Sequence, residues 1–300
     1  MPWLVPAPII LMIGIAACAE ILSKKINTKF IMSNKWIGVM GYPLKQSLSK
    51  QIQEENIKSH HLPWKFKVLE WEPQEFEKNI RELKKDSSCV GFSVTMPYKE
   101  KIISYLDDSE DFATKVSSVN CVKNIDGKWT GYNTDAPGFL ECFKHWNPEP
   151  PKNVQIVMLG AGATARTLSY ALAMQGFKHF TLINRTLERA KVWGEKLRSY
   201  FPDIKVDDNL EMTNVFILNT TPLGKKIDGD EAVSRNENLD IFEISKLKNP
   251  AWIFDVTYNP AETLLIRQCR SRCFYTMNGW PMFMEQANLA FKIWKKGTGA

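Results

Sequence analysis

The sequence contains few of the residues that build disulfide frameworks and zinc sites. Its 300 residues include six cysteines and four histidines, and no two cysteines form a CxxC pair. The histidines do not complete a zinc-binding spacing, so we expect no metal. Cys269 and Cys273 are four residues apart and are expected to be two small buried residues, on one face if their segment is helical. Scattered thiols fit a reducing compartment, which favours a cytoplasmic protein.

Strong charge of either sign is also lacking. The formal net charge is only +6, and no dense run of Lys and Arg alternates with aromatic residues. These features argue against a nucleic-acid partner, although a mild positive charge favours the approach of an anionic ligand. The chain has no internal repeat and no low-complexity tract. Its apolar content of 44% is typical of a globular protein.

The N-terminal segment lacks charge but is a poor membrane span. Residues 3–19 carry no charge, yet three prolines fall within the first eight residues. A transmembrane helix needs about 20 apolar residues, and a secretory signal needs a positive region that is missing here. We therefore expect no membrane partner, and we interpret residues 1–34 as an appended extension. A start at Met32 and a signal-like cleavage after Ala17 or Ala19 are the alternatives.

The first half of the chain alternates between strand and helix patterns. Short apolar runs predict strands over residues 36–40, 64–69, 89–96, 119–125 and 128–132. Between them, helices are predicted over residues 49–59 (capped at its start), 73–85 (with Pro73 in its first turn) and 100–105. The Asp126-Gly127 pair predicts a tight turn between the last two strands. This alternation indicates an α/β layer structure.

A second unit follows the prolines at positions 148, 150 and 151. Residues 154–159 form a nearly continuous apolar run, typical of a strand buried on both faces. A glycine-rich turn follows, and a helical pattern then continues to Gln175 and ends at Gly176. Further strands are predicted over residues 180–183, 215–218 and 252–256, and a last helix over 282–294. Two domains are expected for a chain of this length.

The glycine-rich turn predicts a dinucleotide site. It fits GxGxxA and lies between a predicted strand and a predicted helix, which is the context that the motif requires. Glycine lets the backbone approach a pyrophosphate, and the helix start supplies N–H groups. The residues of this turn are Gly160, Ala161, Gly162, Ala163, Thr164 and Ala165.

The end of the next strand favours NADP over NAD. An NAD site usually has an acidic residue there to bind the ribose 2′-hydroxyl, but this chain has Asn184, Arg185 and Thr186. Arg189 follows one helical turn later. Guanidinium groups bind a 2′-phosphate through charge-assisted hydrogen bonds, whereas a carboxylate repels it.

Short polar residues also gather after the strands of the first half, where open α/β sheets bind ligands. They occur in GYPLKQSLSK (41–50), TMPYK (95–99), SSVNCV (117–122) and GYNTDAPGF (131–139). Together with GAGATA, NRT (184–186), NTTPLG (219–224), DVTYNP (255–260) and NGWPMFMEQANLAF (278–291), these strings resemble the shikimate dehydrogenase family. The resemblance extends over about residues 36 to 296.

The resemblance implies a two-domain α/β protein. Its substrate-binding catalytic domain would span residues 35–136 and be completed by the C-terminal helix at about 280–300. A Rossmann-type NADP-binding domain with a parallel sheet would span 137–279. The implied reaction is the reversible NADPH-dependent reduction of 3-dehydroshikimate to shikimate, in the pathway to chorismate and the aromatic amino acids. The oligomeric state is left open, with a homodimer as the candidate.

The resemblance also assigns roles to single residues. Lys99 and Asp135 would form the catalytic pair. Ser47 and Ser49 would hold the substrate carboxylate, Thr95, Asn120 and Gln286 the ring hydroxyls, and Tyr258 would lie near the nicotinamide and the substrate. Thr220 and Gly279 would join the cofactor site. Hydride transfer to a ketone builds negative charge on oxygen, so an ammonium within about 3 Å can stabilise that charge and supply a proton.

Several positions depart from the family pattern and leave two alternatives open. Gln46, Lys50, Ser93 and Cys121 stand where other residues are usual, which would shift affinity or admit a related ring acid. One alternative is therefore a quinate/shikimate dehydrogenase with relaxed substrate or cofactor choice. The other is a non-catalytic nucleotide-sensing protein on the same fold, which the retained Lys99 and Asp135 disfavour.

Overall fold

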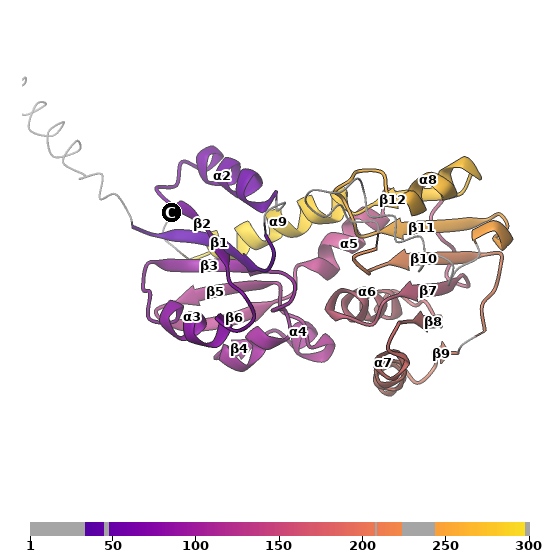
Figure 1. Cartoon of the computed structure of the whole chain (residues 1–300), viewed down its shortest axis with the longest axis horizontal. Coiled ribbons are helices and arrows are strands. Elements are labelled where there is room, and N and C mark those ends of the chain that lie inside the picture. Colours follow the sequence, from indigo (N-terminus) through magenta and orange to yellow (C-terminus); the bar gives the residue numbers. More distant parts are fainter. Residues whose placement is uncertain (1–33, 45–47, 208, 224–243, 298–300) are drawn as a thin grey trace, which may run out of the picture.

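The structure, a computed structural model, describes residues 34–44, 48–207, 209–223 and 244–297. Nearly all of the predicted N-terminal extension, together with Gln46 and Ser47, lies outside the described residues. Two six-stranded sheets form two lobes that lie side by side, each with helices against it (Figure 1). This arrangement confirms the predicted two-domain α/β fold.

The sheet of the first lobe is mixed, in the order β2-β1-β3-β5-β6-β4. The strands β2, β1 and β3 are parallel, whereas β5 is antiparallel to both β3 and β6. Asp126 and Gly127 join β5 to β6 with φ angles of 52° and 85°, as a tight hairpin turn requires. The strand bounds are β1 Trp36–Gly41, β2 Lys65–Glu70, β3 Cys89–Val94, β4 Asp108–Ser109, β5 Cys121–Ile125 and β6 Lys128–Tyr132.

The helices of this lobe alternate with its strands. They are α2 Ser49–Ser59, α3 Phe76–Leu83, the 3-10 helix η1 Lys101–Tyr105, α4 Asp111–Val116 and α5 Asp135–Phe143. Two predictions about their starts were wrong. The residue before α2 is Leu48, whose side chain does not cap that end. Pro73 lies in a turn before α3 and not in its first turn.

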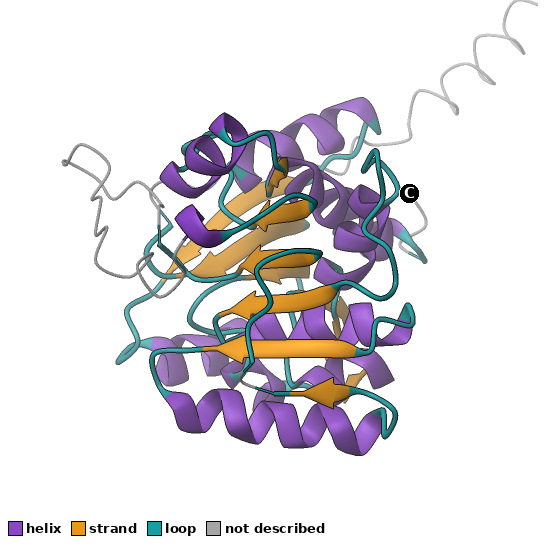
Figure 2. Cartoon of the chain, turned by 90° about the vertical axis from the view of Figure 1, so that its right-hand side faces the viewer, coloured by secondary structure: helices purple, strands orange, loops and turns teal. Residues whose placement is uncertain are grey.

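The sheet of the second lobe is fully parallel, in the order β12-β11-β10-β7-β8-β9. Counted from β7, this is the 3-2-1-4-5-6 order of dinucleotide-binding folds. The central strands are buried along their whole length because helices lie on both sides of the sheet (Figure 2). The strands are β7 Gln155–Leu159, β8 His179–Ile183, β9 Lys205–Val206, β10 Val215–Asn219, β11 Ala251–Asp255 and β12 Tyr275–Asn278.

The last helix returns to the first lobe. It is α9, Trp280–Lys295, and the other helices of the second half are α6 Ala163–Met174, α7 Leu187–Tyr200, η3 Ile244–Lys246 and α8 Leu264–Ser271. The indole N–H of Trp294 donates to the carbonyl of Val122 at 2.9 Å, and Gln53 of α2 donates to the carbonyl of Ala287 at 2.9 Å. The chain thus crosses between the lobes at both α5 and α9 (Figure 1).

The cysteine expectations were partly wrong. Cys269 is buried in α8, but the helix ends at Ser271, so Cys273 does not share its face. Cys273 is exposed and has a positive φ of 59°. Among the described residues, no cluster of His, Cys, Asp and Glu could hold a metal ion. Within the same ranges, no helix has the length and apolarity needed to span a membrane.

Candidate active site

Lys99 and Asp135 lie in direct contact. The Nζ atom of Lys99 is 2.6 Å from Oδ2 of Asp135, and the two side chains are only 14% and 7% exposed. Lys99 follows β3, and Asp135 is the first residue of α5 directly after β6. The ends of β3 and β6 therefore bring an ammonium and a carboxylate together where little solvent reaches them.

A turn around Pro97 sets the position of Lys99. The N–H of Tyr98 donates to the carbonyl of Thr95 at 2.9 Å, and the N–H of Thr95 donates to the carbonyl of Met40 at 2.8 Å. The buried ring of Tyr98 stacks on Phe76 with a centroid distance of 4.4 Å. This anchoring holds Thr95 at the strand end and lets the next residue after Tyr98 reach Asp135.

Asn120 orients the carboxylate of Asp135. Its buried Nδ2 atom lies 2.9 Å from Oδ1 of Asp135 and 2.9 Å from the hydroxyl of Thr134. Its Oδ1 atom accepts the N–H of Thr134 at 2.6 Å. The same Nδ2 atom is 3.3 Å from Oε1 of Gln286 on α9. The structure therefore brings together four of the predicted site residues: Lys99, Asp135, Asn120 and Gln286.

A glycine on α5 lets α9 come close enough to place Gln286. A Cβ atom at Gly138 would lie 2.9 Å from the backbone nitrogen of Gln286 and 3.1 Å from the carbonyl oxygen of Met282. Real Cβ atoms essentially never lie 2.9 Å from a backbone atom, so any larger residue here would force α9 to shift. Gln286 also donates through Nε2 to the carbonyl of Phe283 at 2.9 Å, which fixes its side chain.

The other described residues that the family resemblance assigns to the substrate are Ser49, Thr95 and Tyr258. Ser49 is the buried first residue of α2, and Thr95 ends β3 next to the turn that carries Lys99. Tyr258 stacks on Phe283 of α9 with a centroid distance of 4.3 Å and an interplanar angle of 17°. Burial raises the pKa of the Tyr258 phenol, so this ring stays neutral over the physiological pH range.

The glycine turn lies where the strand order of the second sheet reverses, between β7 and β10. Gly160 has a φ of +107°, and a Cβ atom there would be 2.6 Å from the hydroxyl oxygen of Thr220. Gly162 is the residue before α6, so the first N–H groups of that helix face the turn. Dinucleotides bind at this crevice in folds with this strand order. Ala161 and Ala165 are buried, and Ala163 and Thr164 are half-buried in the first turn of α6.

The other predicted cofactor residues follow β8, β10 and β12, except Arg189, which lies in the first turn of α7. Asn184 follows β8, and its Nδ2 atom donates to the carbonyl of Thr186 at 2.8 Å. Arg185 and Arg189 are exposed around the start of α7. Gly279 precedes α9, and a Cβ atom there would be 2.1 Å from the carbonyl oxygen of Val256. This contact explains why the position requires glycine.

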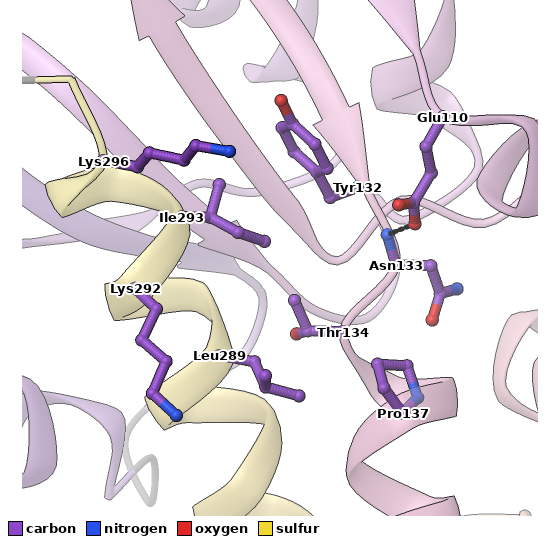
Figure 3. Close-up of a pocket in the computed structure, with 9 residues that line it drawn as sticks. All are labelled: Glu110, Tyr132, Asn133, Thr134, Pro137, Leu289, Lys292, Ile293 and Lys296. Carbon is purple, nitrogen blue, oxygen red and sulfur yellow. Dashed lines mark hydrogen bonds between the residues drawn. The ribbon is translucent and has the colours of Figure 1, made fainter.

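Asn133 and Thr134 belong to the GYNTDAPGF motif but had no predicted role, and Glu110 was not predicted as a site residue. The N–H of Asn133 donates to the Glu110 carboxylate, and both residues line a pocket of about 250 Å³ between α9 and the β6–α5 junction (Figure 3). Lys292 and Lys296 of α9 also line it. Thr134, the chain neighbour of Asp135, lines the pocket, whereas Lys99 and Asp135 do not. No sequence motif marked Glu110.

This combination of fold and site is typical of a two-lobed α/β dehydrogenase, with an ammonium–carboxylate pair in one lobe and a glycine turn at the strand-order reversal of the other. Comparison with known proteins narrows the class. A model of the shikimate dehydrogenase substrate-binding domain matches residues 39–122, and a shikimate/quinate 5-dehydrogenase model matches residues 147–250. The chain belongs to the shikimate dehydrogenase family.

Relatives agree over most of the chain. It is 34% identical over 260 residues to a shikimate dehydrogenase (NADP(+)) of Oceanobacillus iheyensis, covering 85% of this chain and 90% of that protein. The Aquifex aeolicus enzyme is 36% identical over 259 residues, with 86% and 90% covered. A crystal structure of shikimate dehydrogenase from Aquifex aeolicus has a TM-score of 0.74 at 35% identity, covering 87% and 92%. A shikimate dehydrogenase crystallised with NADP+ has a TM-score of 0.73 at 29% identity, covering 87% and 90%.

Proposed function

We propose that this protein catalyses the reversible NADPH-dependent reduction of 3-dehydroshikimate to shikimate, in the pathway to chorismate and the aromatic amino acids. Family membership supports this reaction, because the curated relatives are NADP(+) shikimate dehydrogenases. The observation that carries the proposal is the Lys99–Asp135 contact at 2.6 Å, with Asn120 and Gln286 held beside it.

Lys99 is the proton donor in this proposal. When the substrate ketone gains a hydride, negative charge develops on its oxygen, and an ammonium at that position stabilises the charge and gives up a proton. Asp135 holds the ammonium in place and accepts a hydrogen bond from a neighbouring substrate hydroxyl. In the oxidation direction the neutral amine takes the proton back. The nicotinamide, when bound, supplies or accepts the hydride.

The other site residues bind and orient the ligands. Ser47 and Ser49 hold the substrate carboxylate, Thr95, Asn120 and Gln286 bind the ring hydroxyls, and Tyr258 lies between substrate and nicotinamide. Residues 35–136, completed by the helix at about 280–300, act as the substrate domain, and residues 137–279 act as the cofactor domain. We place the enzyme in the cytoplasm, consistent with the five described cysteines being free thiols. A homodimer is the candidate assembly.

The cofactor site takes NADP. The residues of the glycine turn, 160–165, receive the pyrophosphate at the start of α6, with Thr220 and Gly279 at the neighbouring strand ends. Arg185 and Arg189 clamp the 2′-phosphate, with Asn184 and Thr186 shaping the loop between them. Both guanidinium groups are exposed, so they are available to an incoming phosphate.

A second candidate function is the oxidation of quinate by the same site. It is favoured by the family model, which describes shikimate and quinate 5-dehydrogenases alike, and by the departures at Gln46, Lys50, Ser93 and Cys121. Quinate carries an additional ring hydroxyl, so its acceptance depends on room beside the substrate carboxylate.

One steady-state assay separates these possibilities. The absorbance of the reduced nicotinamide is followed with shikimate or quinate, each paired with NADP+ or NAD+. The proposal predicts the fastest turnover for shikimate with NADP+. Faster turnover of quinate would favour the second function, and no turnover with any pair would leave a nucleotide-binding protein without this activity.

A further inference from the structure

The helix that begins at the glycine turn also holds the substrate lobe. Arg166, one turn into α6, donates through Nε to the carbonyl of Val116 at 2.9 Å and through Nη2 to the carbonyl of Ser117 at 3.0 Å. These carbonyls end α4 of the first lobe, where a cation is favoured by the helix dipole. The same Nη2 atom is 3.1 Å from Oε1 of Glu100.

The next residue of α6 makes a second contact between the lobes. The hydroxyl of Thr167 lies 3.0 Å from Nδ2 of Asn133, and it donates to the carbonyl of Ala163 at 2.9 Å. Asn133 donates through the same Nδ2 atom to the carbonyl of Ser118 at 2.9 Å, and its Oδ1 atom accepts the N–H of Ala136 in the first turn of α5. Thr167 and Asn133 are both buried, at 0% and 3% exposure.

The partners of these two residues are chain neighbours of the Lys99–Asp135 pair. Glu100 directly follows Lys99, and Asn133 precedes Asp135 by two residues. Arg166 and Thr167, which are consecutive in α6, therefore contact the two segments of the substrate lobe that carry Lys99 and Asp135. The ion pair with Glu100 is half-exposed, with 45% of the Glu100 side chain accessible, so it contributes little energy. The buried Thr167–Asn133 hydrogen bond contributes more than the Arg166–Glu100 ion pair.

We infer that Arg166 and Thr167 are positioning residues for the reaction, and this inference rests on the proposed function. Their hydrogen-bond and ion-pair partners do not include Lys99 or Asp135, but the two residues fix where α6 and its glycine turn lie relative to that pair. Hydride and proton transfer both depend on that spacing, because a misplacement of about 1 Å can reduce a rate 100-fold. If ligand binding at one lobe changes these contacts between the lobes, the affinity of the other lobe for its ligand changes with it, and we expect this coupling.

The test compares two substitutions at one position. Thr167→Val keeps the shape of the side chain and removes the hydroxyl, whereas Thr167→Ser keeps the hydroxyl. We expect Thr167→Val to lower kcat at least about tenfold, while the Kd of shikimate alone and of NADP+ alone, measured by calorimetry, change less than about twofold. In the parent, saturating shikimate should change the Kd of NADP+. In Thr167→Val this change should largely disappear. Thr167→Ser should restore both kcat and this coupling.

A second variant covers the case in which Thr167→Val does not fold. Arg166→Gln removes the bonds to Val116 and Ser117 at a partly exposed site, and it should show the same loss of kcat with unchanged binding of shikimate alone. If the parent is active and the folded variants keep its kcat and its coupling, the inference is wrong while the proposed function stands. Equal losses in Thr167→Val and Thr167→Ser would also contradict the inference. A parent that turns over no substrate–cofactor pair would contradict the proposed function and this inference with it.

Discussion

The ammonium of Lys99 lies 2.6 Å from the carboxylate of Asp135, although 36 residues separate them in the chain. The contact forms because β3 and β6 end at the same edge of the first sheet, with β5 between them. Asn120, directly before β5, adds the hydrogen bond that fixes the carboxylate. The positions of the two residues are thus set by the strands of the first sheet.

In the proposed cofactor site, Arg185 binds the 2′-phosphate and sets the preference for NADP+. Arg185→Ala should raise the KM for NADP+ about 10- to 100-fold, because it removes a charge-assisted hydrogen bond worth about 1.5–3 kcal/mol. The KM for NAD+ should change less than about twofold, since NAD+ has no 2′-phosphate. Lys191→Ala, at another exposed cation of α7, controls for the general loss of positive charge. Equal effects of Arg185→Ala on both cofactors would contradict the phosphate clamp.

The close approach of α5 and α9 depends on Gly138. Gly138→Ala should lower the free energy of unfolding by about 1–3 kcal/mol, because the new Cβ atom meets backbone atoms of α9 that cannot move alone. It should also raise the KM for shikimate through displacement of Gln286. Urea denaturation and steady-state kinetics measure the two effects.

Gly194→Ala is the matched control for that substitution. Its Cβ atom would lie 3.1 Å from a side-chain methyl of Val206, which can shift, and alanine favours a helix over glycine by about 1 kcal/mol. We expect this variant to be neutral or slightly stabilised. Equal stability of the Gly138→Ala and Gly194→Ala variants would show that α9 does not need the glycine.

Glu110 should make stability depend on pH. Burial raises the pKa of its carboxyl above the ordinary value of 4.5, against the opposing hydrogen bond from the N–H of Asn133. The folded protein then binds this proton more tightly than the unfolded chain, so the contribution of Glu110 to stability is greatest below pH 4.5 and falls as the pH rises through the folded pKa.

The variant Glu110→Gln isolates this contribution, since it keeps an oxygen acceptor and cannot ionise. Urea denaturation from pH 4.5 to 7.5 should show the variant gaining stability relative to the parent as the pH rises. If the free energy of unfolding of the variant relative to the parent stays constant or falls with rising pH, burial does not dominate the pKa of Glu110.

Local patterns were sufficient to predict the strand before the glycine turn, the hairpin at Asp126-Gly127 and the two-domain fold. They were not sufficient for α5, because Pro137 and Gly138 interrupt its helical pattern. In the structure Pro137 falls in the first turn, where its missing N–H costs nothing, and Gly138 admits α9. The first-turn position therefore explains Pro137, whereas only the packing of two distant segments explains Gly138.

The contacts between the lobes were also beyond sequence reasoning. Asn133 and Thr167 are 34 residues apart, and neither belongs to a pattern that specifies a partner. Their contact depends on how one sheet lies against the other, which periodicity and turn chemistry do not encode. The polar groups at strand ends were predictable because strand direction alone decides where they lie.

Hydride transfer in a Lys99→Ala variant tests the account most directly. A single-turnover measurement with shikimate and NADP+ both saturating follows the nicotinamide absorbance, and circular dichroism checks the fold. We predict a rate about 10²- to 10⁴-fold below that of the parent with the Kd of NADP+ unchanged, because Lys99 supplies and accepts the proton. A folded variant that transfers hydride at a rate near that of the parent would contradict this role for Lys99.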